Sequence, residues 1–187
     1  MIIGVMGMSG SGKSTFCSFL KELGAEVIDA DKIAREVLDK GTDGLKEVEE
    51  RFGCEVIFSD GSLDRKKLGS IIFNNPEKLE ILNSITTKRI DNEIIKRAKE
   101  SKSDFIVIDC PMLHNIDAKD MCDKIVLVKA PVEVMTERII ERDSLTYEGA
   151  KARISAQESD FHKFADIVIE NNGTLEDLRN QAKKLKG

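Results

Sequence analysis

The chain has 187 residues, of which 41% are hydrophobic and 34% are charged, as in an ordinary soluble globular domain with a proper core. Its formal net charge of -5 provides no overall attraction to nucleic acid or to an anionic membrane. No window approaches the run of about 18 apolar residues that spans a bilayer, and the start lacks the pattern of a signal peptide. We therefore expect a cytoplasmic protein with no nucleic-acid, membrane or protein partner.

The run IIGVM at residues 2–6 predicts a strand, and the segment GMSGSGKST follows it at once. This segment matches the pattern G-x-x-x-x-G-K-[ST] through Gly7, Gly12, Lys13 and Ser14. A flexible turn would need neither the lysine nor the hydroxyl group in this register. The pattern therefore predicts a loop that binds the phosphates of a nucleotide.

In such loops the glycines let backbone N–H groups approach phosphate oxygens, and the next helix directs the positive end of its dipole to the same place. Lys13 adds a full charge near the β- and γ-phosphates, the Ser14 hydroxyl can coordinate Mg²⁺, and Thr15 can bond an α-phosphate oxygen. The expected loop residues of the nucleotide site are Gly10, Ser11, Gly12, Lys13, Ser14 and Thr15.

The helix that begins near Lys13 is predicted to stop at Gly24, and AEVID at 25–29 predicts a second strand. A strand–helix–strand unit of this kind forms a parallel sheet with right-handed crossovers. The strand ends in DAD, so Asp29 and Asp31 emerge at the carboxyl edge, where open α/β sheets bind ligands. A carboxylate there can accept the proton of an acceptor hydroxyl. The alternative for Asp31 is the N-cap of the next helix, and the two roles are compatible.

Residues 32–103 contain no obvious core strand and are predicted to be mostly helical. The expected segments lie at 31–41, 43–53, 60–73 (which opens with a turn) and 76–100, which Pro76 begins. A helical insertion of this size either grips a second substrate or only adds packing, and the pattern alone leaves both interpretations open.

The third strand, DFIVID at 104–109, is an apolar run closed by Asp109, an arrangement typical of Mg²⁺-supporting Walker B strands. The alternative is a turn-forming aspartate ahead of Pro111. Two more apolar runs, at 124–130 and 165–170, complete the strand set. Because these runs are continuously apolar rather than alternating, we expect a sheet covered by helices on both faces.

Residues 131–159 are predicted to be helical and are rich in arginine. Arg138 and Arg142 are four residues apart and face one way on a helix. A mobile segment can bring them onto a transferring phosphoryl group, where they neutralise charge and expel water. The alternative is surface pairing with Glu133, Glu137 or Glu141.

The last segment, at 174–187, predicts a helix. Thr174 and Asp177 have the spacing of a capping box, and the closing lysines match the negative end of the helix dipole. We expect those lysines to be solvated.

Four cysteines lie far apart in the chain, and only two histidines accompany them. This spacing excludes a zinc-type ligand cluster. Cys17 and Cys110 lie within apolar segments, so reduced thiols that pack as small hydrophobic groups are expected.

Phosphate loops occur in GTPases, transport ATPases and small-molecule kinases. The guanine-specific N-K-x-D run is absent from the sequence, and so is an L-S-G-G-Q-type transporter signature. With a carboxylate expected beside the loop, the pattern favours a kinase.

From about Ile2 to Leu178 the chain resembles the dephospho-coenzyme A kinase family. The matching segments are GSGKST (10–15), VIDADKIAREV (27–37), FG (52–53), DGSLDRKKLGSIIF (60–73), ERIIERD (137–143), Gln157 and ADIVIENNG (165–173). The second and fourth of these segments discriminate far better than the phosphate loop, because their order and distances also fit.

The resemblance implies an α/β, P-loop kinase-like fold of three layers, with a central parallel sheet, a helical substrate-binding insertion and a lid. The implied division is a nucleotide-binding core at 1–31, 104–137 and 160–187, a mostly helical acceptor region at 32–103, and a lid at 138–159. It also implies ATP and Mg²⁺ as cofactors and phosphorylation of a small-molecule substrate, the ribose 3′-hydroxyl of dephospho-coenzyme A.

The resemblance also implies roles for single residues. Asp31 matches the family's catalytic carboxylate, Arg142 matches a lid arginine near the ATP phosphates, and adenine would lie near Asn171 and Gly173. Taking the residue patterns and the resemblance together, we expect Lys13, Asp31, Arg138 and Arg142 to be catalytic, Asp31 and Arg65 to bind the acceptor, and Ser14 and Asp109 to bind the metal.

Two segments depart from the family's pattern. The family usually has His-Pro where this chain has Thr86-Thr87, and commonly has P-L-L-F-E where this chain has PMLHN at 111–115. Both segments lie where the acceptor is expected to bind. Two alternatives therefore remain: a P-loop kinase for another small nucleoside-like acceptor, and a nucleotide-binding regulatory protein without turnover.

Overall fold

The computed structural model describes residues 1–73, 75–157 and 160–186. It consists of two compact units, Met1–Asp29 with Ala98–Gly187, and Ala30–Arg97. The division of these units into nucleotide core, acceptor region and lid stays a prediction.

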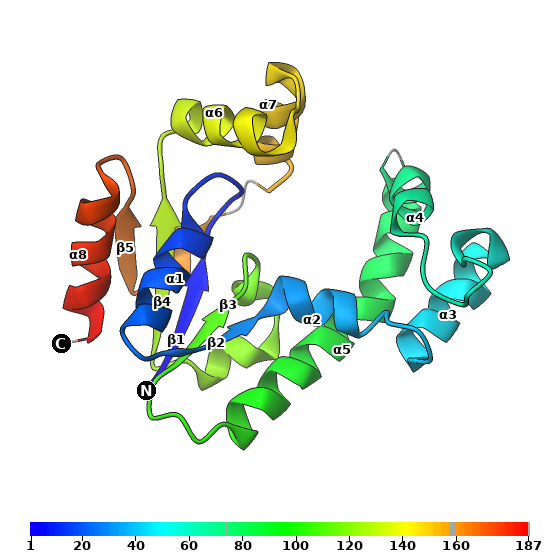
Figure 1. Ribbon diagram of the computed structural model, residues 1–187, viewed down its shortest axis with the longest axis horizontal. Coiled ribbons are helices and arrows are strands. Elements are labelled where there is room, and N and C mark those ends of the chain that lie inside the picture. The colour runs from blue at the N-terminus through cyan, green and yellow to red at the C-terminus, as the bar shows by residue number, and fades with distance from the viewer. Residues whose placement is uncertain (74, 158–159, 187) are drawn as a thin grey trace. The chain divides into compact units, whose positions relative to one another are not determined.

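The first unit is built on a sheet of five parallel strands (Figure 1). In the order β2-β3-β1-β4-β5 they are Glu26–Asp29, Ile106–Asp109, Ile2–Met6, Lys124–Lys129 and Ile167–Glu170. All five predicted strands and their parallel arrangement are therefore confirmed. Because β1 is the central strand, the segment that follows it emerges in the middle of the carboxyl edge, where ligands bind in such sheets.

Two helices cover one face of this sheet, α1 (Lys13–Glu22) and α8 (Leu175–Lys186). Phe16 and Leu20 of α1, four residues apart, are fully buried in a core that also contains Leu178 of α8 and the inward side chains of the strands. The predicted capping box of α8 is confirmed, because Asp177 accepts the Thr174 N–H at 2.8 Å and Thr174 Oγ1 accepts the Asp177 N–H at 3.2 Å.

Short 3₁₀ turns, η2 (Leu113–Asn115) and η3 (Asp117–Met121), follow β3 in the chain. A Cβ atom at Gly4 of β1 would lie 2.2 Å from Leu113 Cδ2 and 2.9 Å from the Cys122 sulfur. Glycine at this position therefore lets η2 and the end of η3 pack directly on the central strand.

The region predicted to be helical at 131–159 contains two helices, α6 (Val132–Asp143) and α7 (Tyr147–Ser155). The helix α6 ends just before Ser144, whose φ of 53° is left-handed. The helix α7 then begins after Thr146, whose side chain accepts the Gly149 N–H. The two helices share a small core of Met135, Ile139, Ala150 and Ile154. A further 3₁₀ turn, η4 (Phe161–Lys163), precedes β5.

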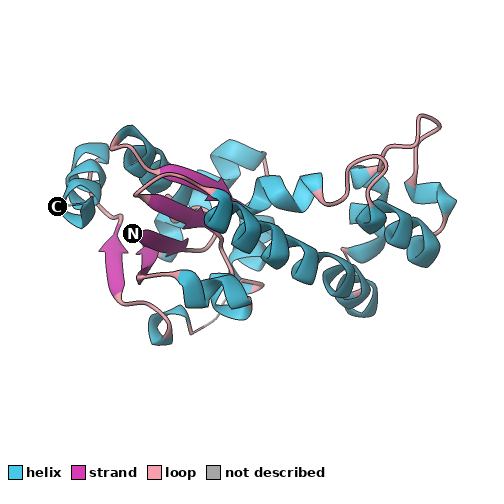
Figure 2. Cartoon of the chain, turned by 90° about the horizontal axis from the view of Figure 1, so that it is seen from below, coloured by secondary structure: helices cyan, strands magenta, loops and turns pink. Residues whose placement is uncertain are grey.

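The second unit is helical, and all five named strands belong to the first unit (Figure 2). Its elements are α2 (Ala30–Glu36), α3 (Asp43–Phe52), η1 (Cys54–Val56), α4 (Arg65–Ile72) and α5 (Pro76–Glu100), which crosses the division at Arg97. It has its own core, made by Leu38, Leu45, Val48, Phe52, Val56, Leu63, Leu68 and Ile85. The insertion is therefore a folded body in its own right.

The helix α2 ends earlier than predicted, at Glu36 instead of next to Gly41. The Leu38 N–H bonds to the carbonyl of Arg35, three residues back, so the chain tightens into turns. Thr42 Oγ1 then donates to the Val37 carbonyl at 2.9 Å and accepts the Leu45 N–H at 3.2 Å, which ends one helix and starts the next. No such side-chain stop is visible in the helical periodicity.

None of the four cysteines, all of which lie in the described residues, forms a disulfide bond, and Cys17 and Cys110 are buried as expected. Burial raises the pKa of the Cys122 thiol to about 12. Among the described residues, no helix is both long enough and apolar enough to cross a bilayer.

Truncating the inward face of α1 should destabilise the protein. We expect Leu20→Ala, at a fully buried position, to lower the free energy of unfolding by about 2–5 kcal/mol through lost transfer energy and a cavity. Leu175→Ala is the matched control, because that side chain is 68% exposed and its loss should change the value by less than about 0.5 kcal/mol. Urea unfolding followed by circular dichroism measures both, and equal effects would contradict the described core.

Candidate active site

The glycine-rich loop joins β1 to the first residue of α1. Gly10 and Gly12 have left-handed φ values of 79° and 92°. A Cβ atom would lie 2.6 Å from the Met135 carbonyl oxygen at Gly10 and 2.0 Å from Asn171 Nδ2 at Gly12. Both positions therefore require glycine for two reasons, the backbone conformation and the close approach of a neighbour.

Lys13 and Asp109 form a buried ion pair at this edge of the sheet. Lys13 begins α1 and Asp109 is the last residue of β3, so the pair joins the helix start to the strand end. Burial raises the pKa of the Asp109 carboxyl, and the Lys13 ammonium opposes that shift. Asp29, the neighbour of Asp109 in register on β2, adds a second negative charge that also raises it.

Three side chains from distant segments hold consecutive residues of the loop. Arg138 Nη1 donates to the Gly10 carbonyl at 3.1 Å, and Asn171 Nδ2 donates to the Ser11 carbonyl at 2.8 Å. The Ser9 N–H donates to the amide oxygen of Gln157 at 2.8 Å. The loop conformation is thus supported from α6, from the segment after α7 and from the end of β5.

Gln157 was not among the expected site residues. The one sign of a role for Gln157 in the sequence is its place among the residues that match the family. Its hydrogen bond to Ser9 joins residues 148 positions apart in the chain. A contact of this range cannot be read from local pattern.

The two predicted lid arginines have different partners. Arg138 contacts the loop, whereas Arg142 forms two hydrogen bonds of 2.8 Å with the carboxylate of Asp143. Arg153 of α7 also pairs with Asp143, at 2.7 Å. These bonds raise the pKa of Arg142 and lower that of Asp143, so Arg142 pairs with a carboxylate that its helical spacing did not indicate.

Oxygen donors for a metal ion are few but of the right chemistry. No group of three His, Cys, Asp or Glu side chains among the described residues can hold a metal by itself. Ser14, exposed in the first turn of α1, offers a hydroxyl, and Asp109 offers a carboxylate. Because Mg²⁺ in phosphoryl-transfer sites takes one or two protein oxygens and fills its shell with water and phosphate, this donor set fits Mg²⁺.

The remaining predicted nucleotide residues lie at the ends of α1 and β5. Thr15 is half-buried in the first turn of α1. Gly173 is exposed, and a Cβ atom there would lie 2.7 Å from the capping carboxylate of Asp177. Gly173 therefore allows the chain to turn tightly into α8.

In the second unit, Asp31 lies inside the first turn of α2 and is exposed. The helix begins at Ala30, so the N-cap alternative for Asp31 is wrong. Arg65 is the first residue of α4, where its guanidinium donates to the Arg35 carbonyl at 2.9 Å and lies 3.7 Å from Asp39.

A cavity of about 250 Å³ lies within the second unit beside Arg65. Apart from Arg65 and Thr86, its lining is apolar or glycine: Ala34, Leu38, Leu63, Leu68, Gly69, Ile72, Leu82 and Ile90. Thr86 Oγ1 donates to the Leu82 carbonyl at 2.9 Å. One departure from the family's pattern, Thr86, therefore lies on the wall of an apolar cavity.

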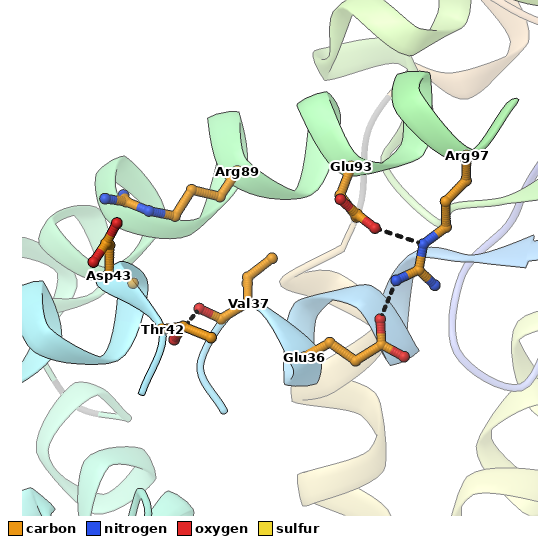
Figure 3. A pocket seen from close by; sticks show the side chains of 8 residues that line it. Glu36, Val37, Thr42, Asp43, Arg89, Glu93 and Arg97 are labelled. Atoms are coloured by element: carbon orange, nitrogen blue, oxygen red, sulfur yellow. Dashed lines mark hydrogen bonds and ion pairs between the residues drawn. The ribbon is translucent and has the colours of Figure 1, made fainter. Parts of the chain in front are cut away.

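A second cavity of the same unit, about 320 Å³, has five charged side chains in its lining: Glu36, Asp43, Arg89, Glu93 and Arg97 (Figure 3). Arg97 of α5 pairs there with Glu93, at 2.9 Å, and with Glu36 at the end of α2. Arg89, nearer the other end of the cavity, pairs with Glu47 at 2.8 Å. Because the arginines already have carboxylate partners, this cavity lacks the surplus positive charge that would attract an anion.

The other departure lies in the first unit, where His114 of η2 is buried. Its ring stacks on Phe164 with 4.9 Å between centroids and meets Phe161 edge-on at 5.2 Å. Burial lowers its pKa. His114 therefore packs as an aromatic core residue.

The model of the dephospho-CoA kinase family matches residues 1–177. Dephospho-CoA kinase of Carboxydothermus hydrogenoformans is 42% identical over 96% of this chain and 90% of the relative, and that of Fusobacterium nucleatum is 44% identical over 95% and 93%. Among solved structures, dephospho-CoA kinase from Campylobacter jejuni is 30% identical with a TM-score of 0.72, covering 99% of this chain and 94% of that one.

Shikimate kinase from Acinetobacter baumannii, at 18% identity and a TM-score of 0.58 over 99% of this chain and 90% of that chain, shares the fold. The predicted P-loop kinase-like architecture is therefore confirmed. The comparisons do not support the alternative acceptor or the regulatory protein without turnover. On the extent of the family match and the identity to its members, this chain belongs to the dephospho-CoA kinase family.

Proposed function

We propose that this kinase transfers the γ-phosphoryl group of ATP to the ribose 3′-hydroxyl of dephospho-CoA, giving CoA and ADP. The observation that carries the proposal is the phosphate loop with its buried Lys13, in a chain whose family match runs through residues 1–177. Phosphoryl transfer depends mostly on positioning and on charge stabilisation, and we assign both tasks to residues of this chain.

ATP would bind with its phosphates on the loop from Gly10 to Thr15. The backbone N–H groups at the start of α1 and the Lys13 ammonium attract the triphosphate. Because Lys13 is paired with Asp109, the incoming phosphate has to take over or share that ammonium. Adenine is proposed to lie beside the segment that follows β5, near Gly173.

Mg²⁺, held by Ser14 and Asp109, would neutralise charge on the β- and γ-phosphates. Asp109, which pairs with Lys13, could hold such a cation once the Lys13 ammonium bonds to phosphate, and the cation would then offset the charge of this carboxylate. Arg138, which already contacts the loop, and Arg142 of the proposed lid supply further positive charge.

Asp31 is the proposed catalytic carboxylate. It is exposed in the first turn of α2, directly after the strand whose last residue is Asp29. An ionised carboxylate can accept the proton of the ribose hydroxyl as its oxygen attacks the γ-phosphorus.

The acceptor is proposed to bind to the second unit. Its apolar cavity beside Arg65 suits the aliphatic part of a coenzyme, and the Arg65 guanidinium suits a phosphate group, which would compete with Asp39, 3.7 Å away. Both features support the proposed acceptor region at 32–103.

The acceptor itself tests the proposal. Purified protein with ATP and Mg²⁺ should release ADP with dephospho-CoA and should form CoA, as chromatography and mass spectrometry show. Adenosine, shikimate and pantetheine serve as comparison acceptors and should give no more than background. ADP release equal to background with dephospho-CoA would refute the proposed function.

Replacing the proposed catalytic carboxylate should separate binding from turnover. Asp31→Asn removes the proton acceptor, so we expect kcat to fall by about 10²–10⁴-fold while the calorimetric affinity for ATP changes little. Asp104→Asn is the control, because Asp104 is an exposed residue ahead of β3, and it should retain the normal rate. An unchanged kcat in Asp31→Asn removes Asp31 from the mechanism.

The buried ion pair predicts opposite effects with and without metal. Asp109→Asn removes the negative charge that competes with phosphate for the Lys13 ammonium, so metal-free ATP should bind about tenfold more tightly, the size of one charge-assisted hydrogen bond. The same change should abolish most of the gain in ATP affinity on adding Mg²⁺. Lys13→Ala should weaken binding under both conditions. Titration calorimetry in EDTA and in Mg²⁺ measures these affinities. Weaker metal-free ATP binding in Asp109→Asn would contradict the idea that Asp109 and the ATP phosphates compete for the Lys13 ammonium.

A further inference from the structure

Asn171 follows β5, and both its backbone and its side chain are held. Its backbone N–H donates to the Lys129 carbonyl at 2.7 Å, which extends the pairing of β5 with β4 by one residue. Its side chain reaches the Ser11 carbonyl at 2.8 Å and is 5% exposed. Because the partner is a carbonyl oxygen, the amide nitrogen has to face it, so the orientation of the carboxamide is defined.

This hydrogen bond sets the direction of one peptide group in the phosphate loop. In a trans peptide the C=O and N–H groups point in opposite directions, and the structure has no cis peptide bond among the described residues. With the Ser11 carbonyl turned towards Asn171, the Gly12 N–H points away from it. Gly12 is the N-cap of α1, so this N–H joins the unpaired amides of the helix start that bind anions.

The contact is also tight. The 2.0 Å that separates a Cβ atom at Gly12 from Asn171 Nδ2 shows that the carboxamide rests directly on the Gly12 backbone. Ser11 itself is 1% exposed, so an unbonded carbonyl there would be isolated from water. The glycine and the asparagine therefore form one packing unit, although 159 positions of sequence separate them.

We propose that Asn171 is a positioning residue that acts on ATP through the phosphate loop, by holding the Ser11–Gly12 peptide with its N–H towards the phosphates. This inference rests on the proposed use of ATP and changes the expected role of Asn171, which is not to recognise adenine. Its buried carboxamide, already bonded to Ser11, has little surface left for a base.

The test separates a phosphate effect from a base effect. Binding of ATP, GTP and inorganic tripolyphosphate is measured by calorimetry and competition for the normal protein and for Asn171→Ala. Loss of the bond leaves a buried carbonyl unsatisfied and the peptide free to rotate, so all three affinities should fall together, by about tenfold. The ratio of ATP to GTP affinity should stay unchanged.

Two further variants sharpen the result. Asn171→Asp keeps the shape of the side chain but places a carboxylate against the Ser11 carbonyl, so its phosphate affinity should fall further than that of Asn171→Ala. The control is Asn180→Ala, which changes an exposed asparagine on α8 and should bind all three ligands as tightly as the wild-type protein does. Thermal unfolding by circular dichroism checks that each variant is folded. If Asn171→Ala does not fold, the three affinities of the near-isosteric Asn171→Asp test the inference instead.

Two outcomes overturn the inference. In one, ATP affinity falls while GTP and tripolyphosphate bind as before, which would make Asn171 a reader of adenine. In the other, all three affinities are unchanged. Neither depends on turnover, so a failure of the proposed phosphoryl transfer, seen as no CoA formed by the normal protein, is a separate result.

Discussion

The buried pair of Lys13 and Asp109 is the interaction on which the site depends. A lone ammonium or carboxylate at this depth would lose its hydration without compensation, so each group requires the other. Because one group starts α1 and the other ends β3, their attraction fixes the helix start against the sheet edge. In the proposed function, an anion that enters the loop would meet a lysine already in place, and the Asp109 carboxylate would be offered to a cation.

The strands and the loop were predictable because their signals are local. Short, continuously apolar runs rich in Val and Ile predict strands covered on both faces, because their length is that of a strand and too short for a helix, and all five were found. The end of α2 and the break after α6 were not predictable. One depends on the Thr42 side chain, which bonds two separate stretches of backbone, and the other on a left-handed serine, a conformation with no reliable sequence signal.

A sequence motif identifies the site residues that belong to it, but not their hydrogen-bond partners from distant parts of the chain. The glycines, Lys13 and Ser14 follow from one motif, but the motif does not indicate which side chains bond its carbonyl groups. Arg138 and Arg142 share a helix face, yet Asp143 holds one of them because an adjacent carboxylate meets a guanidinium in bidentate geometry. Asn171 has a place in the family segment, and its bond to Ser11 emerges only from the folded chain.

The shared core of α6 and α7 has a mechanical consequence. Met135 and Ile139 of α6 pack with Ala150 and Ile154 of α7, so a shared apolar core joins the two helices. Because Arg138 and Arg142 both belong to α6, any displacement of this helix that moved Arg138 away from the Gly10 carbonyl would move Arg142 as well.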